Sequence, residues 1–331
     1  MKLTNLLLSF LLIFSSHVFA SDINIDEGET YFSVTNKTLS EFSFINSVSD
    51  ISTMIVKTEN GEFVKLVVPA YGSDSKNGDA ELPVLQKLIR VPFGSEIAVK
   101  IINLEEKIIN LSDYGFSIPV FPNQPSVSKS ETDIPFYFNQ EYYNLDNFTG
   151  NNIVETKLLG KMRGQQLARL SISPFSYNPT TNELKVVTKV EVKVIFKNID
   201  INADNENRIR YYSPEFESLF KTCVNNTPIT EKDVITTYPV KYVIISDPAF
   251  QAVLQPLVDW KKKKGFLVVE EYTNNPLVGN TTSSIHAFIK DMYDNATPQD
   301  PAPTYLLIVG DDAQVPSFNA TSQGTSHVSD M

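Results

Sequence analysis

Two short apolar runs decide the fold of this sequence, Tyr242-Val-Ile-Ile245 and Tyr305-Leu-Leu-Ile-Val309. Both runs are unbroken and contain β-branched residues, which is the pattern of strands buried on both faces of a parallel sheet. We therefore predict that each run is a central strand. The segment that contains them extends from Tyr238 to Phe318.

A helix is predicted directly after the first run. Asp247 can cap its N-terminus, Pro248 suits its first position, and Gly265 can close its far end in the left-handed conformation. Lys261–Lys264 lie where positive charge complements the helix dipole. One stripe at helical spacing carries the apolar residues Phe250, Val253, Leu254, Leu257 and Val258.

A further strand and a second helix precede the second run. Phe266–Val269 is predicted as the strand. Thr281, Thr282 or Ser283 can cap the helix, one face of which carries Ile285, Phe288, Ile289 and Met292. The order strand, helix, strand, helix, strand predicts right-handed crossovers and a parallel sheet covered by helices.

Ligands of such sheets bind beyond the carboxyl ends of the strands. In this sequence those ends are Ser246-Asp247 and Gly310-Asp311-Asp312. Neither group contains a cysteine or a histidine. The pattern therefore predicts the functional edge of the sheet but not the reacting groups.

This segment resembles the start of the catalytic domain of the gingipain family, secreted cysteine endopeptidases made as proproteins. The matching stretches stand in the family's order: Lys241-Tyr-Val-Ile-Ile-Ser-Asp-Pro-Ala-Phe250, Leu257-Val-Asp-Trp-Lys-Lys-Lys-Lys-Gly-Phe266, Leu307-Ile-Val-Gly-Asp-Asp-Ala-Gln-Val-Pro316 and Gly324-Thr-Ser-His-Val-Ser-Asp330. The resemblance implies that residues 238–331 are the N-terminal part of a gingipain-like α/β peptidase domain, incomplete at its C-terminus.

The resemblance also bears on the catalytic residues. In the family, the catalytic histidine lies in a Gly-His-Gly-like turn and the catalytic cysteine lies at the end of a later strand. Neither motif occurs in this sequence. We therefore expect no catalytic residue within this chain, both catalytic residues beyond Met331, and no activity of the 331 residues alone. The complete enzyme would cleave protein or peptide substrates, with a preference that these residues do not reveal.

Residues 21–200 show a different pattern, short alternating strands separated by turns. Met54–Lys57 and Phe63–Val68 flank the dipeptide Asn60-Gly61, which favours a tight hairpin because both turn positions need positive φ. Apolar residues alternate with mostly polar ones from Val190 to Phe196. We predict an all-β domain, either an antiparallel sandwich or a jelly-roll-like fold.

The β-rich region resembles the gingipain propeptide. The matching stretches are Gly78-Asp-Ala-Glu-Leu-Pro83, Val91-Pro-Phe-Gly94, Arg163-Gly-Gln-Gln-Leu-Ala-Arg-Leu170 and Pro174-Phe-Ser-Tyr-Asn-Pro179. The resemblance implies a domain that assists folding, packs on the catalytic domain and keeps the enzyme latent until proteolysis between the two domains.

Residues 201–237 are predicted to be an exposed linker, because Asn202–Asn207 is polar and acidic. A short helix is expected around Phe216–Lys221. If activation involves cleavage after a basic residue, the linker offers Arg208, Arg210, Lys221 and Lys232. Each of these is also explained as a solvated charge, so the linker and not a particular bond is predicted as the cleavage region.

Residues 1–20 predict a secretory signal peptide. Lys2 is followed by the apolar run Leu6–Phe14, which is short for a membrane span, and cleavage is expected after Ala20. A retained membrane anchor is the alternative. No other stretch is long and apolar enough to cross a membrane, so we expect a secreted or cell-surface product.

The net charge of −11 argues against a nucleic-acid partner.

Cys223 is the single cysteine, so an intrachain disulfide is excluded and a thiol nucleophile is restricted to one position. A lone cysteine beside apolar residues is usually a small buried hydrophobe, and we favour that interpretation. His286, on the second helix, is expected to be half-buried or at the surface. His327 is predicted to lie in a polar loop near the end and is a candidate to line the substrate cleft of the complete protein.

Paired acids follow the second run at Asp311 and Asp312, a place suited to calcium or to chemistry. The resemblance implies a structural calcium ion and makes Asp311 the preferred ligand, with Asp330 as a further candidate. Solvation alone is the competing explanation for these acids. Asp247 also follows a strand, but its fit as a helix cap explains it without chemistry.

Three functions are consistent with the sequence. The first is the precursor of a secreted gingipain-like cysteine endopeptidase. The second is a non-enzymatic secreted protein that binds, inhibits or helps to assemble a peptidase. The third is a catalytically dead member of the family. Residues after Met331 would distinguish them.

Overall fold

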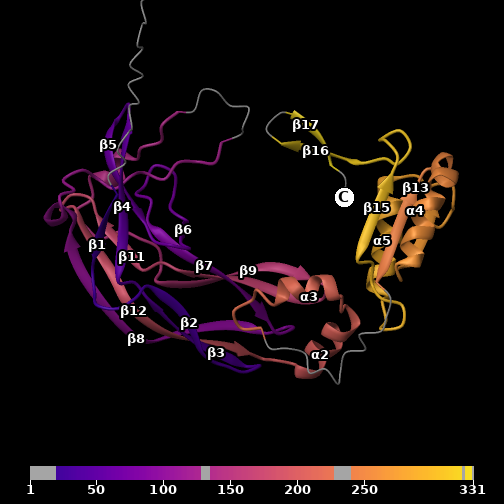
Figure 1. The fold of residues 1–331 in the computed structure, drawn as a ribbon, viewed down its shortest axis with the longest axis horizontal. Coiled ribbons are helices and arrows are strands. Elements are labelled where there is room, and N and C mark those ends of the chain that lie inside the picture. Colours follow the sequence, from indigo (N-terminus) through magenta and orange to yellow (C-terminus); the bar gives the residue numbers. More distant parts are fainter. Residues whose placement is uncertain (1–19, 128–134, 227–239, 323–324, 330–331) are drawn as a thin grey trace, which may run out of the picture.

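The computed structural model describes residues 20–127, 135–226, 240–322 and 325–329. A β-rich region comes first and a smaller α/β segment follows it (Figure 1). This order confirms the two predicted fold classes. Residues 1–19 of the predicted signal peptide, Lys232 and Asp330 lie outside the described residues.

Antiparallel sheets make up the β-rich region. One sheet has the order β1-β4-β5, with strands Ala20–Asn24, Asp50–Thr58 and Gly61–Val67. A second has the order β6-β7-β10-β9, with strands Gly72–Ser73, Pro83–Val91, Gln165–Ile172 and Val154–Met162. The largest has the order β11-β12-β3-β2, with β8 beside β12; its strands are Phe175–Asn178, Glu183–Lys197, Glu41–Ser47, Tyr31–Lys37 and Glu96–Asn110. Two short helices are η1, Leu111–Tyr114, and α1, Gln140–Tyr143.

Strand β12 links the two cores of this region. Its side chains alternate as predicted, so that Val190, Val192 and Val194 are fully buried. They pack beside Phe44, on the neighbouring strand β3 of the same sheet, and with Leu170, on β10, in a core between the second and the largest sheets. The first part of β12 contributes to another core beneath β1, β4 and β5. Sheets that face each other across apolar cores form a sandwich.

The predicted hairpin forms, but its turn residues are Glu59 and Asn60 and not the predicted pair Asn60-Gly61, and Asn60 does not have positive φ. Strands β4 and β5 pair in antiparallel register, with Thr58 opposite Gly61. Gly61 has φ of 122°, in the region that favours glycine.

The prediction of an exposed linker is corrected for residues 201–226. This segment forms α2, Ile201–Arg210, and α3, Pro214–Phe220. Asp204 and Arg208 are buried, with exposed fractions of 6% and 5%. The polar composition misled the prediction because the polar side chains bind one another and the β-rich region.

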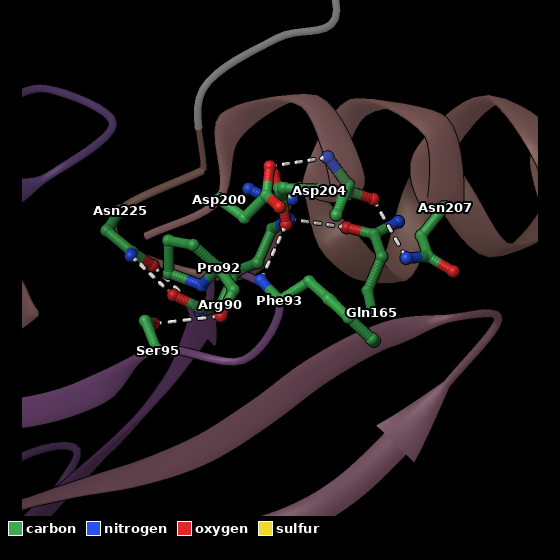
Figure 2. Close-up of polar contacts among 10 residues, drawn as sticks. Arg90, Pro92, Phe93, Ser95, Gln165, Asp200, Asp204, Asn207 and Asn225 are labelled. Carbon is green, nitrogen blue, oxygen red and sulfur yellow. Dashed lines mark hydrogen bonds and ion pairs between the residues drawn. The ribbon is translucent and has the colours of Figure 1, made fainter. Parts of the chain in front are cut away.

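A buried polar network holds the segment in place (Figure 2). The guanidinium of Arg90, on β7, pairs with the carboxylate of Asp204 and donates from Nε to Gln165 at 2.7 Å. The backbone N–H of Phe93 donates to Asp204 Oδ1 at 2.9 Å. Asn225 exchanges two hydrogen bonds with the backbone of Arg90, at 2.9 and 2.7 Å. Residues 201–226 are therefore structurally part of the β-rich region.

The α/β segment has the predicted order of elements. Its strands are β13, Lys241–Ser246, β14, Leu267–Tyr272, and β15, Tyr305–Val309, and its helices are α4, Gln251–Lys263, and α5, Thr282–Asp294. All strand pairs are parallel, in the order β14-β13-β15. Alternate residues of β13 point to opposite faces, where Ile244 packs with α4 and Ile245 packs with α5. The central-strand prediction is confirmed for β13. For β15 it stays a prediction: among the described residues β15 pairs with β13 alone, and its Tyr305 is 39% exposed.

The ends of both helices follow the predicted signals with small differences. Asp247 caps a 3-10 turn, η2, Pro248–Phe250, which leads into α4. Thr281 caps α5 and forms a capping box with Ser284. Val253 was assigned to the buried stripe of α4 but is 72% exposed, so this assignment is wrong.

A final hairpin follows β15. It consists of β16, Phe318–Ser322, and β17, Thr325–Ser329. His327, predicted in a polar loop, lies instead on β17. Within the described part of the chain, no helix is long and apolar enough to cross a membrane.

Candidate functional site

A cavity of about 330 Å³ lies at the carboxyl ends of the three parallel strands. The loops after β13, β14 and β15 line it with Asp247, Pro248, Thr273, Asn274, Asn280, Ala313, Gln314 and Pro316. The chain moves from β13 to one side of the sheet and then back to the other, so this edge is a topological switch point. Ligands of open parallel sheets bind at such points. The predicted functional edge is therefore hollowed and lined mainly by amide, hydroxyl and carboxylate groups.

The side chain of Asp247 is hydrogen-bonded to the backbone of the turn that follows it, as the capping interpretation predicts. Its Oδ1 accepts a hydrogen bond from the backbone N–H of Ala249 at 2.8 Å. The strand it follows and the turn it caps place it on the cavity wall.

The turn after β15 brings Asp311 and Asp312 to the same edge. Gly310 makes this turn with φ of 146°, and a Cβ there would lie 3.0 Å from Val315 Cγ2. Asp311 Oδ1 accepts from the N–H of Ala313 at 3.0 Å. Asp312 Oδ1 accepts from the hydroxyl of Ser317 at 2.6 Å and from its N–H at 2.9 Å, and these hydrogen bonds lower the pKa of the Asp312 carboxyl.

Calcium at Asp311 stays a prediction. Both acids are exposed, which suits a cation. Calcium takes six to eight oxygen ligands, however, and no group of three or more His, Cys, Asp or Glu side chains converges within the described residues. Asp311 therefore supplies one carboxylate at the edge and not a ligand set.

Cys223 is the buried hydrophobe that the sequence predicts. It is 3% exposed and packs with Leu167 and Phe220 beneath α3. Burial raises the pKa of its thiol from 9.0 to about 11. Cysteine catalysis needs a thiolate, so this environment opposes a nucleophilic role.

His286 and His327 lie on α5 and β17, whereas Cys223 comes directly after α3. His286 is exposed on α5, in agreement with the predicted surface position. His327 lies on β17, and only its backbone pairing with Ala320 is described.

The basic residues considered for activation differ in accessibility. Arg208 is buried within α2, and Arg210 donates from Nε to the carbonyl of Ala296 at 2.9 Å. Proteases act on extended, accessible segments, so the folded structure disfavours cleavage at both positions. Lys221 is exposed at the end of α3.

The β-rich region contacts the α/β segment, as the resemblance implies, but the residues that make the contact were not predicted from the sequence. Arg163, in the turn between β9 and β10, donates from Nη1 to the carbonyl of Pro303 at 2.7 Å. The rings of Tyr211 and Tyr293 stack at 5.0 Å. The one sequence signal at this contact is Gly164, which predicts a turn. It does not indicate which groups the neighbouring Arg163 binds.

Two family models match the chain. The model described as Propeptide_C25 matches residues 35–210, and the model described as Peptidase family C25 matches residues 235–331. The first covers the β-rich region from the end of β2 through α2, and the second covers the α/β segment.

Curated relatives agree with this division. Lys-gingipain of Porphyromonas gingivalis (strain ATCC 33277) is 31% identical over 94% of this chain and 18% of that protein. Gingipain R2 of the same species (strain W83) is 24% identical over 73% of this chain and 32% of that protein. The chain thus spans about a fifth of the length of its Lys-gingipain relative.

A solved structure is also similar. The structure that describes the zymogenic latency of gingipain K from Porphyromonas gingivalis is 31% identical, with a TM-score of 0.52. The match covers 54% of this chain and 99% of that one.

Proposed function

The chain belongs to peptidase family C25, the gingipain family, and on this basis we propose that it is the latency propeptide and the first part of the catalytic domain of a secreted cysteine endopeptidase precursor. The single observation that carries the proposal is the coincidence of the two family matches with two successive structural units. The propeptide match ends at residue 210 and the peptidase match begins at 235.

The carboxyl-edge cavity supports a role in the peptidase domain. Asp247, Gln314 and their neighbours form a polar wall at the edge where chemistry collects in parallel sheets. Cys223 is unsuited to act as the nucleophile because it is buried in the propeptide region with a raised pKa. We assign the catalytic cysteine and histidine to residues beyond Met331.

The test is peptide hydrolysis by the complete gene product of which this chain is part. We expect thiol-dependent hydrolysis that appears when the propeptide is released, measured with peptides carrying Lys, Arg or apolar residues at P1. The relatives named Lys-gingipain and gingipain R2 make the basic peptides the first choice. Cys223→Ser should retain full activity; its loss, or the absence of any hydrolysis, would contradict the proposal.

The same assay separates the alternatives. A product that binds a related peptidase and inhibits it without hydrolysing peptides would favour the binding or inhibitor function. A product with neither property would favour a catalytically dead member. The large independent cores of the β-rich region are the observation that keeps the inhibitor function open.

Calcium and export complete the proposal. Calcium bound through Asp311 should be detected by calorimetry, and Asp311→Asn should weaken binding, whereas Asp259→Asn, on the exposed surface of α4, should not. Absence of any calcium-dependent signal would remove the ion from the proposal.

For export, we expect the secreted protein to begin at Ser21, as N-terminal sequencing would show.

A further inference from the structure

The turn between β9 and β10 has a backbone that its sequence does not favour. Arg163 and Gly164 form a two-residue turn with φ of 49° and 70°. Positive φ is unusual for arginine, and asparagine followed by glycine is the preferred pair for such a turn. Outliers of this kind persist where the surrounding structure needs the side chain.

The side chain of Arg163 explains the unusual backbone. It is 5% exposed, and its guanidinium donates to four backbone carbonyls. The bonds to the propeptide side go from Nε to Tyr211 at 3.0 Å and from Nη2 to Tyr212 at 3.4 Å. The bonds to the peptidase side go from Nη1 to Pro303 at 2.7 Å and from Nη2 to Ala302 at 3.5 Å.

Aromatic faces enclose the same guanidinium. The rings of Phe216 and Tyr293 lie 5.3 and 5.6 Å from it. Tyr293 is hydrogen-bonded to the backbone of Arg163 and Gly164 and stacks on Tyr211. A Cβ at Gly164 would lie 2.4 Å from Tyr211, so glycine is needed for this approach. Charge-assisted hydrogen bonds and cation–π contacts in a dry environment are the strong forms of these interactions.

A second arginine acts next to the first. Arg210, the last residue of α2, donates from Nε to Ala296 at 2.9 Å and from Nη2 to the carbonyl of Asp294. Ser213 and Thr304 add a hydroxyl contact at 3.3 Å. All of these peptidase groups lie in residues 293–304, between the end of α5 and the start of β15.

The position of this contact on the sheet shows whether it covers the candidate site. Residues that precede β15 lie at the amino ends of the parallel strands, whereas the cavity with Asp247 and Gln314 lies at the carboxyl ends. In Figure 1, α2 and α3 lie near the lower end of the α/β sheet, and the chain leaves for β16 from the upper end. The contact therefore holds the segment without covering the candidate site.

We propose that the Arg163 turn is the docking anchor that keeps the β-rich region on the α/β segment once the chain between them is cut. Its partner is the surface formed by Tyr293 and the carbonyls of residues 294–303. Before the cut, the connection through residues 227–239 keeps both parts at high effective concentration. After it, pairing depends on noncovalent contacts alone. The inference that this pairing prolongs latency rests on the proposed function. The docking role itself is independent of the proposed function.

The test uses the full chain with a recognition sequence for an added site-specific protease within residues 227–239. After cutting, the two parts should co-elute in size-exclusion chromatography. Arg163→Asn should raise their apparent dissociation constant about 30- to 100-fold, the range of an arginine hot spot. Asparagine suits the turn, so this variant removes the guanidinium without harming the hairpin. The matched control is Arg169→Asn on β10, whose side chain makes a partly exposed ion pair with Asp74.

Hydrogen exchange on the intact chain supplies a second measurement. Amides of residues 293–304 should exchange about 10-fold faster in Arg163→Asn, with β7 and β10 unchanged in protection. Parent parts that separate after cutting, or Arg163→Asn parts that pair like the parent, would overturn the anchor. Neither readout uses peptidase activity. A gene product that hydrolyses no peptide would thus contradict the proposed function but not the docking role of Arg163. An active product whose Arg163→Asn parts pair like the parent would contradict the docking role but not the proposed function.

Discussion

The β-rich region and the α/β segment differ in how they bury their strands. The β-rich region closes two large cores between sheets, and β12 contributes to both. The α/β segment divides a smaller core between the two faces of a three-stranded sheet, with α4 on one face and α5 on the other. Stability should therefore be concentrated in the β-rich region, and the α/β segment should respond more to changes at its helices and at the contact between the two regions.

Two buried arginines show the same difference at the level of single residues. Arg90 pairs with the carboxylate of Asp204 inside the β-rich region, where the pair joins α2 to β7. Arg163 donates to backbone carbonyls and lies between the regions. The partner of Arg90 lies in the same region, whereas two of the four carbonyl partners of Arg163 lie in the other region and are lost when the two regions separate.

The largest effect is expected from breaking the internal pair. Asp204→Ala leaves Arg90 buried without its counter-charge, and loss of one partner of a buried pair costs about 3–5 kcal/mol. Chemical unfolding followed by circular dichroism should show this loss. Asp74→Ala, which removes a partly exposed pair with Arg169, should cost about 1 kcal/mol or less. Equal effects would show that burial does not set the value of these pairs.

The next effect concerns the α/β segment alone. Ile244→Ala removes a fully buried side chain from β13 and should destabilise this segment by about 2–5 kcal/mol. Trp260, the one tryptophan of the chain, lies on α4, so its fluorescence reports this segment separately. The control Val253→Ala changes an exposed position of α4 and should have an effect within about 0.5 kcal/mol. A matching shift of the β-rich transition would mean that the two regions unfold as one.

A pH effect should come from the β-rich region. The pKa of Cys223 is raised from 9.0 to about 11, so the folded state holds the thiol proton more tightly than the unfolded state. The resulting stability is present below pH 9 and is lost as the pH rises to about 11. It amounts to about 2–3 kcal/mol, because one pKa unit corresponds to about 1.4 kcal/mol. Subtracting the unfolding curve of Cys223→Ala isolates this contribution, and identical pH profiles would contradict it.

The smallest effect is expected at the start of α5. Thr281→Ala removes the cap and its capping box with Ser284, a loss of about 1 kcal/mol. Trp260 fluorescence should report it, and Thr282→Ala, at the first helical residue, serves as the comparison. An equal loss for both variants would assign the effect to helix propensity instead of capping.

The order of the α/β elements was predictable because it depends on local signals. The apolar runs at β13 and β15, the cap at Asp247 and the closing Gly265 each act within a few residues. The order β14-β13-β15 of the described strands was not predictable, because strand order depends on which strands pair and not on how apolar each strand is.

The helices of residues 201–226 show the limit of composition. A polar, acidic stretch predicts exposure unless a partner is available, and the partner of Asp204 is Arg90, far away in sequence. The candidate site was predictable to the level of an edge, since Asp247 and Asp311 follow strands. Its cavity was not, because Thr273, Asn274 and Asn280 carry no distinguishing pattern.

The two fold classes, their order and the family follow from the amino-acid sequence, because strand periodicity, helix caps and matching motifs are local features of the chain. Tertiary structure alone decided that Cys223 is buried, that Arg90 meets Asp204, and that Arg163 spans the two regions. These features join residues that are distant in sequence, and a side chain's charge or polarity does not specify which distant group will neutralise or bury it.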